Sequence, residues 1–194
     1  MKEVFNLEEK RNNTLGLVNA SDNLGNFYEY INDSAKAFKY FDSTLAYSNA
    51  INYEQGVNTS YQSKNKFYSK RGNDAQQMQV QQQALQVNNA NQNSIGFNES
   101  NLELGKLNLK QNNPTLAIPY LKKTINLSSE LGELKSKEEA LQAISKAYSD
   151  IGDYKSALES MQELLVLRDS IQEEKNKQAL LAMNLSLELE QKEK

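Results

Sequence analysis

Amide, carboxylate and ammonium side chains recur at a step of 40 residues, and these columns hold the groups best suited to bind a ligand. One column has lysine at three of its four positions, and two neighbouring columns contain amides, hydroxyls and acids. Amides can bond a peptide backbone and lysines attract carboxylates. The predicted ligand-binding residues are Asp22, Asn26, Glu29, Gln62, Lys66, Ser69, Lys106, Gln142, Lys146 and Ser149. The alternative interpretation is that these lysines are ordinary solvated charges.

The chain has few residues for catalytic or metal chemistry. It contains no cysteine and no histidine, which excludes thiolate metal sites, thiol nucleophiles and a histidine base within these residues. The paired acids Glu138-Glu139 and Glu173-Glu174 predict solvated helix surface, because no apolar pocket or second functional group accompanies them. We therefore expect no enzymatic activity in this fragment, no cofactor and no metal site.

Charge and hydropathy exclude two further kinds of partner. The net charge is -3 with acids and bases interspersed, whereas a nucleic-acid-binding surface needs a basic excess or stripe. No apolar run approaches the length of a membrane span, and the first ten residues lack the apolar segment of a signal peptide. We expect a protein or peptide partner, with no nucleic acid and no membrane span in this fragment.

Helical hairpins must position the polar columns. From Ala140 to Leu167, apolar residues recur at helical spacing on both sides of a turn at Ile151-Gly152-Asp153. A single hairpin can bury its apolar stripe only against its own partner, so neighbouring hairpins are needed. The sequence therefore has to supply further copies of this unit.

Further copies follow at the same step of 40 residues. Asp153 is in register with Asn113, Asn73 and Asp33, and each precedes a predicted helix. A short polar side chain at that position can cap the first turn, contributing about 1 kcal/mol. A chain with 38% hydrophobic residues and a mean hydropathy of -0.75 suits local cores between hairpins better than one large core.

These columns resemble the tetratricopeptide repeat. The similar segments are Leu24-Gly25-Tyr28-Ala37-Phe41, Leu104-Gly105-Ala117-Leu121 and Ala147-Tyr148-Gly152-Ala157-Met161. The resemblance implies an all-α fold, a right-handed α-solenoid of helix-turn-helix hairpins with a period of about 40 residues and a long C-terminal helix. It also implies that the first helix of each hairpin lines a concave groove, where the polar columns would hold an extended peptide.

The period predicts the boundaries of the units. We expect residues 1–15 to be the end of a truncated upstream repeat and residues 16–171 to be the array. The units are predicted at about 18–51, 58–91, 98–131 and 138–171, followed by a helical extension or linker at 172–194. The second unit is degenerate, because Asn65, Gln77 and Gln81 occupy sites expected to be small or apolar.

Three local features of the array carry their own expectations. The glutamine-rich tract in the second unit, residues 75–87, predicts an exposed helix rather than a linker, because it contains good helix formers in register with the other units. The polar stretch Asn88–Ser94 predicts a loop or a frayed helix end. Pro119 should remove one backbone hydrogen bond and kink its helix.

The last helix is expected to continue well past Leu167, because no turn signal follows it. Leu164, Leu167, Ile171, Leu181 and Leu185 fit a heptad seam that Glu174 and Gln178 interrupt. The seam makes a homodimer through the C-terminal helix one of the predicted interactions.

A second resemblance concerns residues 167–175, Leu-Arg-Asp-Ser-Ile-Gln-Glu-Glu-Lys. They are similar to the segment that closes the repeat region of many sensor histidine kinases of Bacteroidetes-type bacteria, although Arg168 replaces the commoner lysine. The resemblance implies the tetratricopeptide sensor region of a two-component signal-transduction protein, periplasmic and membrane-anchored. Two alternatives remain: a stand-alone scaffold or adaptor, and a cytoplasmic peptide-responsive regulator of the quorum-sensing type.

Overall fold

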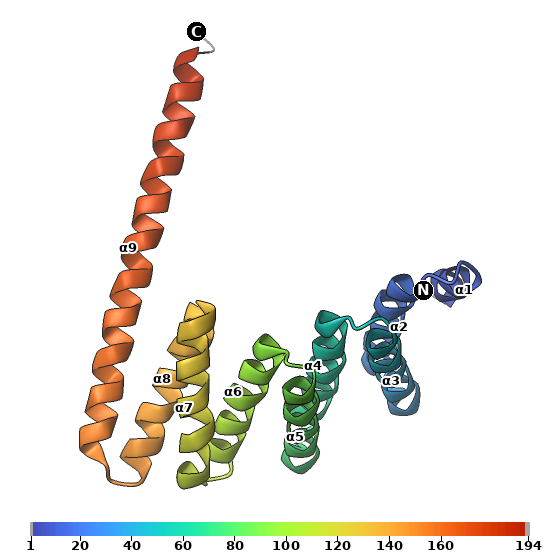
Figure 1. Ribbon diagram of the computed structural model, residues 1–194, viewed down its shortest axis with the longest axis horizontal. Coiled ribbons are helices and arrows are strands. Elements are labelled where there is room, and N and C mark those ends of the chain that lie inside the picture. The colour runs from blue at the N-terminus through green and yellow to red at the C-terminus, as the bar shows by residue number, and fades with distance from the viewer. Residues whose placement is uncertain (1, 193–194) are drawn as a thin grey trace. The chain divides into compact units, whose positions relative to one another are not determined.

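The computed structural model describes residues 2–192, with side chains through residue 184. The described residues form helices and no strands, which confirms the all-α prediction. The helices, shown in Figure 1, are α1 (Lys2–Lys10), α2 (Thr14–Tyr30), α3 (Ser34–Ala50), α4 (Glu54–Lys70), α5 (Asp74–Ala90), α6 (Ser94–Lys110), α7 (Pro114–Leu131), α8 (Leu134–Asp150) and α9 (Tyr154–Lys192).

Helix length is nearly constant through the array. Helices α2 to α6 and α8 contain 17 residues each, and α7 contains 18. Helix α9 contains 39 residues and is the exception, as the sequence predicts for the last helix. From α2 to α6, and again from α7 to α9, successive helices are antiparallel because the connecting turns are short (Figure 1). The 40-residue step of the sequence is thus two helices and two turns.

Each turn has the same backbone geometry. The residue two positions before the next helix has positive φ, at Asn12, Asn32, Asn52, Gly72, Gln92, Asn112, Gly132 and Gly152. The following residue donates its N–H to the carbonyl five residues back, as Asp33 does to Tyr28 and Asp153 to Tyr148. This is the bond of a Schellman motif, which satisfies a carbonyl at the end of one helix. The same residue is the N-cap of the next helix, so one short turn both ends and begins a helix.

The predicted caps occupy these N-cap positions. Asp33, Asn73 and Asp153 each accept a hydrogen bond from the backbone N–H three residues later, at 3.1, 3.2 and 3.1 Å. Asn113 is also at an N-cap but accepts no such bond, and Pro114 follows it. The capping prediction is therefore confirmed at three positions, while at Asn113 the capping bond is missing.

The chain divides into two compact units, Met1–Leu107 and Asn108–Lys194. In the first unit α1 packs on α2, and α2, α3, α4 and α5 pack consecutively, with α2 also against α4. In the second unit α7 packs on α8 and α8 on α9. Within each unit, consecutive helices therefore pack as the repeat pattern predicts.

The core of the first unit has two clusters of different chemistry. Leu24, Tyr28, Ala37, Phe41 and Phe67 form the first cluster, between α2, α3 and α4. A Cβ at Gly25 would lie 2.5 Å from the Phe41 ring, so only glycine allows this close approach. The second cluster, Val57, Tyr61, Val80 and Ala84, is smaller and lies between α4 and α5.

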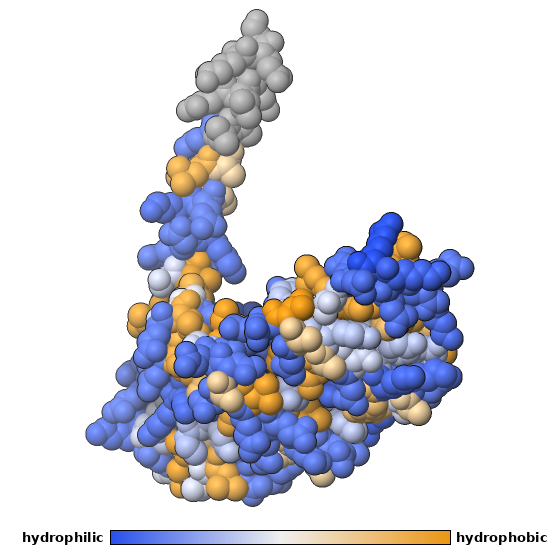
Figure 2. Space-filling model, turned by 45° about the vertical axis from the view of Figure 1, so that its right-hand side comes forward, coloured by the Kyte–Doolittle hydropathy of each residue, from blue (hydrophilic) through white to orange (hydrophobic). Residues whose placement is uncertain are grey.

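The second unit buries small and aliphatic residues. Its fully buried side chains include Ala117 and Leu121 on α7, Ala140 and Ile144 on α8, and Leu164 on α9. Most other residues of α9 through residue 184 are exposed, and Figure 2 shows hydrophobic residues on the surface of this helix below the grey end. The core of this unit therefore ends at one face of α9.

The structure bears on three local expectations, and the kink expected at Pro119 stays a prediction. The glutamine-rich tract is helical, as predicted, but it buries Gln77 and Gln81 instead of lying wholly exposed. The stretch 88–94 contains the end of α5 at Ala90 and a turn at 91–93 before α6 begins at Ser94, so the expected loop is present but shorter than predicted. Pro119 lies inside α7, which continues to Leu131.

The predicted heptad seam also changes. Leu164 is buried with 1% exposure and Ile171 is half-buried, so these residues already serve the fold of the second unit. The seam cannot pair with another helix along its whole length while Leu164 stays in this core. Leu185 of the seam lies outside the residues whose side chains are described.

Candidate peptide-binding surface

Two adjoining cavities lie along the first helices of the first unit. The first, of about 220 Å³, is lined by residues of α2 and α4, and the second, of about 370 Å³, by residues of α4 and α6. Gln55 and Thr59 of α4 line both cavities, so the two spaces meet across this helix. The lining residues of the first are Val18, Asn19, Asp22, Asn23, Tyr53, Gln55, Gly56 and Thr59, and those of the second are Glu54, Gln55, Asn58, Thr59, Gln62, Asn93, Ile95 and Glu99.

The two cavities are polar and carry negative charge. Amides contribute at Asn19, Asn23, Gln55 and Gln62, and the charged residues of the linings are Asp22, Glu54 and Glu99. Neither lining includes a lysine or arginine. The surface is therefore suited to bond a peptide backbone and to attract cationic side chains.

Asp22 joins α2 to α4 at the wall of the first cavity. Ser63 donates its hydroxyl to Oδ1 of Asp22 at 2.8 Å, and Asn26 donates Nδ2 to Oδ2 at 3.0 Å. Burial raises the pKa of the Asp22 carboxyl above its ordinary value of 3.8, while the hydrogen bonds from Ser63 and Asn26 and the charge of Lys66 oppose this shift. A cation bound in this cavity would stabilise the charged carboxylate.

Glu29 is placed differently from the other predicted residues. Its side chain is buried, and Nζ of Lys70 lies 2.8 Å from its Oε1. The ion pair links α2 to α4, which are the first helices of two successive hairpins. Glu29 therefore holds two helices together, and its carboxylate is engaged within the protein.

The remaining predicted residues of the first unit are exposed. Gln62 donates Nε2 to Glu99 at 2.9 Å, which links α4 to α6. Lys106 pairs with Glu103 at 3.2 Å, one turn earlier on α6. Lys66 and Ser69 are exposed on α4. The structure thus brings Asp22, Asn26 and Lys66 together, and Gln62 with Glu99.

Gln142, Lys146 and Ser149 belong to the second unit. They lie on α8 and are exposed. Each is one 40-residue step from its counterpart on the preceding first helix. Their role in a groove shared with the first unit stays a prediction.

A cluster of hydrogen-bonded asparagines lies beside the second cavity. Asn93 donates Nδ2 to Asn88 at 3.1 Å and lies 3.4 Å from Oδ1 of Asn58, while its own Oδ1 accepts from the backbone N–H of Gly96. Asn88 and Asn93 are buried, with 1% and 4% exposure. The cluster joins α4, α5 and the start of α6, so it fixes one wall of the cavity.

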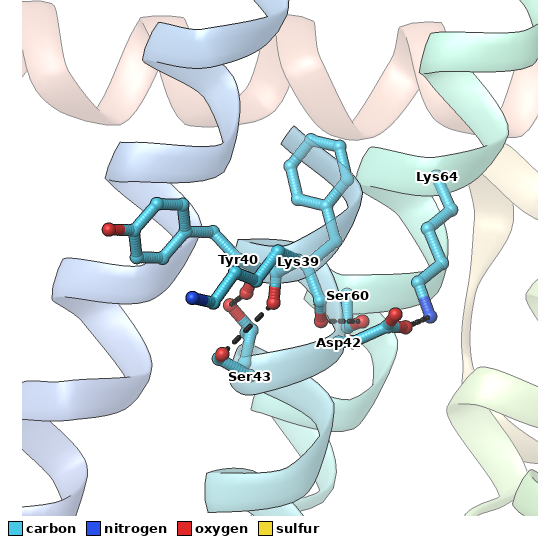
Figure 3. Close-up of polar contacts among 8 residues, drawn as sticks. Lys39, Tyr40, Asp42, Ser43, Ser60 and Lys64 are labelled. Carbon is cyan, nitrogen blue, oxygen red and sulfur yellow. Dashed lines mark hydrogen bonds and ion pairs between the residues drawn. The ribbon is translucent and has the colours of Figure 1, made fainter. Parts of the chain in front are cut away.

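A second polar contact fixes α4 from its other side. Ser60 donates its hydroxyl to the backbone carbonyl of Phe41 at 2.7 Å, and Lys64 pairs with Asp42 at 2.6 Å. Figure 3 shows Ser60 and Lys64 of α4 pointing toward α3 at this junction. Helix α4 is therefore anchored to α3, α2 and α6 by named polar bonds as well as by packing.

Some residues that line the cavities are absent from the predicted set, although the 40-residue step of the sequence also connects them. Asn19, Thr59 and Glu99 are one 40-residue step apart, three residues before the predicted column of Asp22 and Gln62. Residues three apart on a helix share a face. The missed column therefore lies on the predicted face, one turn closer to the start of each helix.

Comparison with known families supports this architecture. Residues 138–168 match the family described as Tetratricopeptide repeat. This segment covers most of α8 and the first part of α9. With the all-helical hairpins, the match supports a tetratricopeptide repeat protein, a class that generally binds protein partners. No curated protein matches the chain.

The described part of the chain has neither a candidate membrane span nor a candidate metal-binding cluster. None of its helices combines the length and the apolar content that crossing a membrane requires. None of its groups of acidic residues is arranged to hold a metal ion.

Proposed function

We propose that the first unit binds an extended peptide segment of a partner protein along α2, α4 and α6. The proposal rests on one observation: two adjoining cavities lie on the face that the 40-residue step predicts as ligand-binding. An extended peptide exposes a donor and an acceptor at each residue. The amides at Asn19, Asn23, Gln55 and Gln62 can bond both kinds of group.

The charges of the lining favour a ligand with a lysine or arginine side chain. Asp22, Glu54 and Glu99 surround the cavities, and the partly buried Asp22 would gain most from a cation. Lys66 lies one turn beyond Gln62 on α4, where it could pair with a carboxylate further along the same peptide. Basic and acidic groups in one ligand would then define its direction.

Affinity selection from a random peptide library on the immobilised chain tests this function. We expect enrichment of peptides with basic residues, and a loss of affinity of about tenfold for Gln62→Ala, because one backbone-bonding amide is removed. Gln83→Ala is the matched control, since Gln83 is also exposed but lies on α5, outside both linings. Equal loss in both variants, or no enrichment of basic peptides, would contradict the proposal.

The lysine column needs its own measurement. Reversing the charge of Lys66, Lys106 and Lys146 together should weaken binding of those selected peptides that also contain acidic residues. Binding that stays unchanged in the triple variant would reject a role for the lysines and favour their interpretation as solvated charges.

We also propose that the chain is the sensory region of a bacterial signalling protein, with a two-component histidine kinase as the favoured output. The support is the resemblance of residues 167–175 and the continuation of α9 to Lys192. In this scheme the ligand would bias α9 through its packing on α8. A periplasmic location is part of the proposal. The parent gene should then encode a membrane span and a kinase domain after residue 194, and a gene without them would support the scaffold alternative.

A further inference from the structure

Helix α9 has an uncovered apolar face that earlier helices of the same register do not have. Leu158, Met161 and Leu165 are 60%, 43% and 53% exposed. One or three 40-residue steps earlier, the residues equivalent to Met161 are Leu121 and Phe41, and both are fully buried. The position of Met161 is therefore one that other helices bury in the core, whereas α9 leaves it exposed.

The first unit shows what covers such a face. The residue equivalent to Leu158 is Phe38, whose ring lies 4.7 Å from Phe67 and 5.1 Å from Tyr68 of α4. The residue equivalent to Leu165 is Leu45, which packs against the Val57 and Tyr61 cluster. A neighbouring helix thus covers this face of α3, and in the second unit α8 packs on α7 in the same way.

The same exposed face of α9 continues along the extension of the helix, although it is not apolar throughout. At about 100° per residue, Tyr154, Leu158, Met161, Leu165, Gln172, Asn176, Ala179 and Met183 fall within an arc of about 60°. The middle of this stripe is polar, and Gln172 donates to Asn176 at 2.8 Å within it. The face is therefore a continuous stripe, with apolar ends and an amide centre.

Charges of opposite sign line the two edges of the stripe. Arg168 and Lys175 lie on one edge, and Asp169 and Glu173 lie on the other. Arg168 already donates Nε to Glu138 of α8 at 2.7 Å, so the cationic edge rests mainly on Lys175. When two identical helices pair in parallel about a two-fold axis, opposite edges meet, so a cationic edge faces an anionic one. In an antiparallel pair like edges would meet, with repulsion on both sides.

We propose that the stripe of α9 binds the same stripe of a second copy of this chain, as a parallel two-fold pair. Each copy then covers the other's apolar residues, and Gln172 and Asn176 face their own counterparts. Self-complementarity of shape, polarity and charge is what a two-fold interface requires. This face differs from the predicted heptad seam, whose Leu164 is occupied in the core.

Analytical ultracentrifugation of the chain tests the pairing. The wild type should be a dimer, and Leu165→Glu should raise the dimer dissociation constant at least about tenfold, because it places a carboxylate in the apolar stripe. Val166→Glu is the matched control: Val166 is 70% exposed on the same helix but lies outside the stripe, and its variant should dimerise as the wild type does. Circular dichroism should show unchanged helicity in both variants.

The absence of native cysteine allows a second measurement that does not depend on a destabilising variant. In a parallel pair Leu158 meets its own counterpart, so Leu158→Cys should give disulfide-linked dimers under mild oxidation, and Val166→Cys should not. A monomeric wild type would overturn the proposal, and the face would then be one that a helix other than α9 of a second copy covers. Dimers unaffected by Leu165→Glu, or cross-linked equally by both cysteines, would also overturn it.

Discussion

The hairpin of α2 and α3 and the hairpin of α4 and α5 have the same helix lengths and turns, but they bury different chemistry. The first encloses Phe41 and the stacked rings of Tyr28 and Tyr40, 5.4 Å apart. The second has Gln81 at the position of Phe41 and Gln77 at the position of Ala37. Packing between α2 and α3 is correspondingly more extensive than between α4 and α5.

The difference shows that turns and caps set the geometry while the core sets the stability. Among the residues that the structure describes, Oδ1 of Asn65 and Oε1 of Gln77 in the second hairpin are buried without a hydrogen-bond partner, and so is Oγ of Ser21 in the first. A buried unpaired acceptor costs about 1–3 kcal/mol. The second hairpin nevertheless keeps its 17-residue helices. It is also the hairpin that contributes α4 to both cavities, so the weakest core lies beneath the proposed binding surface.

The largest expected effect comes from exchanging the central core residues for alanine. Phe41→Ala should lower the free energy of unfolding by about 3–5 kcal/mol, because it leaves a cavity in a close-packed aromatic cluster. Gln81→Ala, at the same register, should cost less than about 1.5 kcal/mol. Urea denaturation followed by circular dichroism measures both, and equal losses would show that the two cores contribute alike.

The next effect has the opposite sign. Gln77→Met keeps the shape of the side chain and removes the unpaired amide oxygen, so we expect the free energy of unfolding to rise by about 1 kcal/mol. Gln76→Met is the control at an exposed neighbouring position and should change stability by less than about 0.5 kcal/mol. A loss of stability in Gln77→Met would mean that the buried amide has a favourable role in this core.

Removal of a cap should have a similar or smaller effect. Asn73 accepts from the N–H of Gln76, so Asn73→Ala should cost about 1 kcal/mol. Tyr53, at the N-cap of α4, makes no side-chain cap bond. Hydrogen exchange of the α5 amides reports the loss at Asn73 directly, with exposed Gln82→Ala on the same helix as reference. Unchanged exchange rates would show that packing alone fixes the start of α5.

The smallest effect concerns the contact between the two hairpins at Asp22. Because burial raises the pKa of Asp22 above 3.8 in the folded protein, the folded state binds this proton more tightly than the unfolded state. The contribution of Asp22 to stability is therefore most favourable below pH 3.8 and declines as the pH rises through the folded-state pKa. Unfolding curves should show Asp22→Asn matching the wild type at low pH and exceeding it slightly near neutrality. A gain confined to low pH would reverse the assigned direction.

Much of the fold could be predicted from spacing, because caps and apolar residues follow local rules. Asp33, Asn73 and Asp153 fixed the register of the helices before any contact was known. The recurrence of a positive φ every 20 residues cannot be seen in the sequence, because Asn32, Gly72 and Gln92 share a backbone conformation but not a residue type. The loop predicted at 88–94 is limited to residues 91–93, and the helical Asn88 accepts a hydrogen bond from Asn93, a pairing that composition does not indicate.

The site was less predictable because it depends on contacts between helices. The sequence placed Asp22 and Gln62 on one face, and the structure has both in cavity linings. It could not show that Glu29 is paired with Lys70, since that contact joins residues of neighbouring first helices. Nor could it show that Leu164 is buried against the hairpin, because leucines of a helix core and of a coiled-coil seam have the same spacing.

The uniform turn has a consequence for how the chain can change in length. Since every turn from Asn12 to Gly152 places its left-handed residue 20 positions after the last one, deleting residues 54–93 would join α3 to α6 through a turn of unchanged type. Gain or loss of a whole hairpin leaves every cap and core position in frame. An insertion of any other length would rotate the following helices away from their cores. The array can therefore become longer or shorter by duplication or deletion of whole 40-residue hairpins.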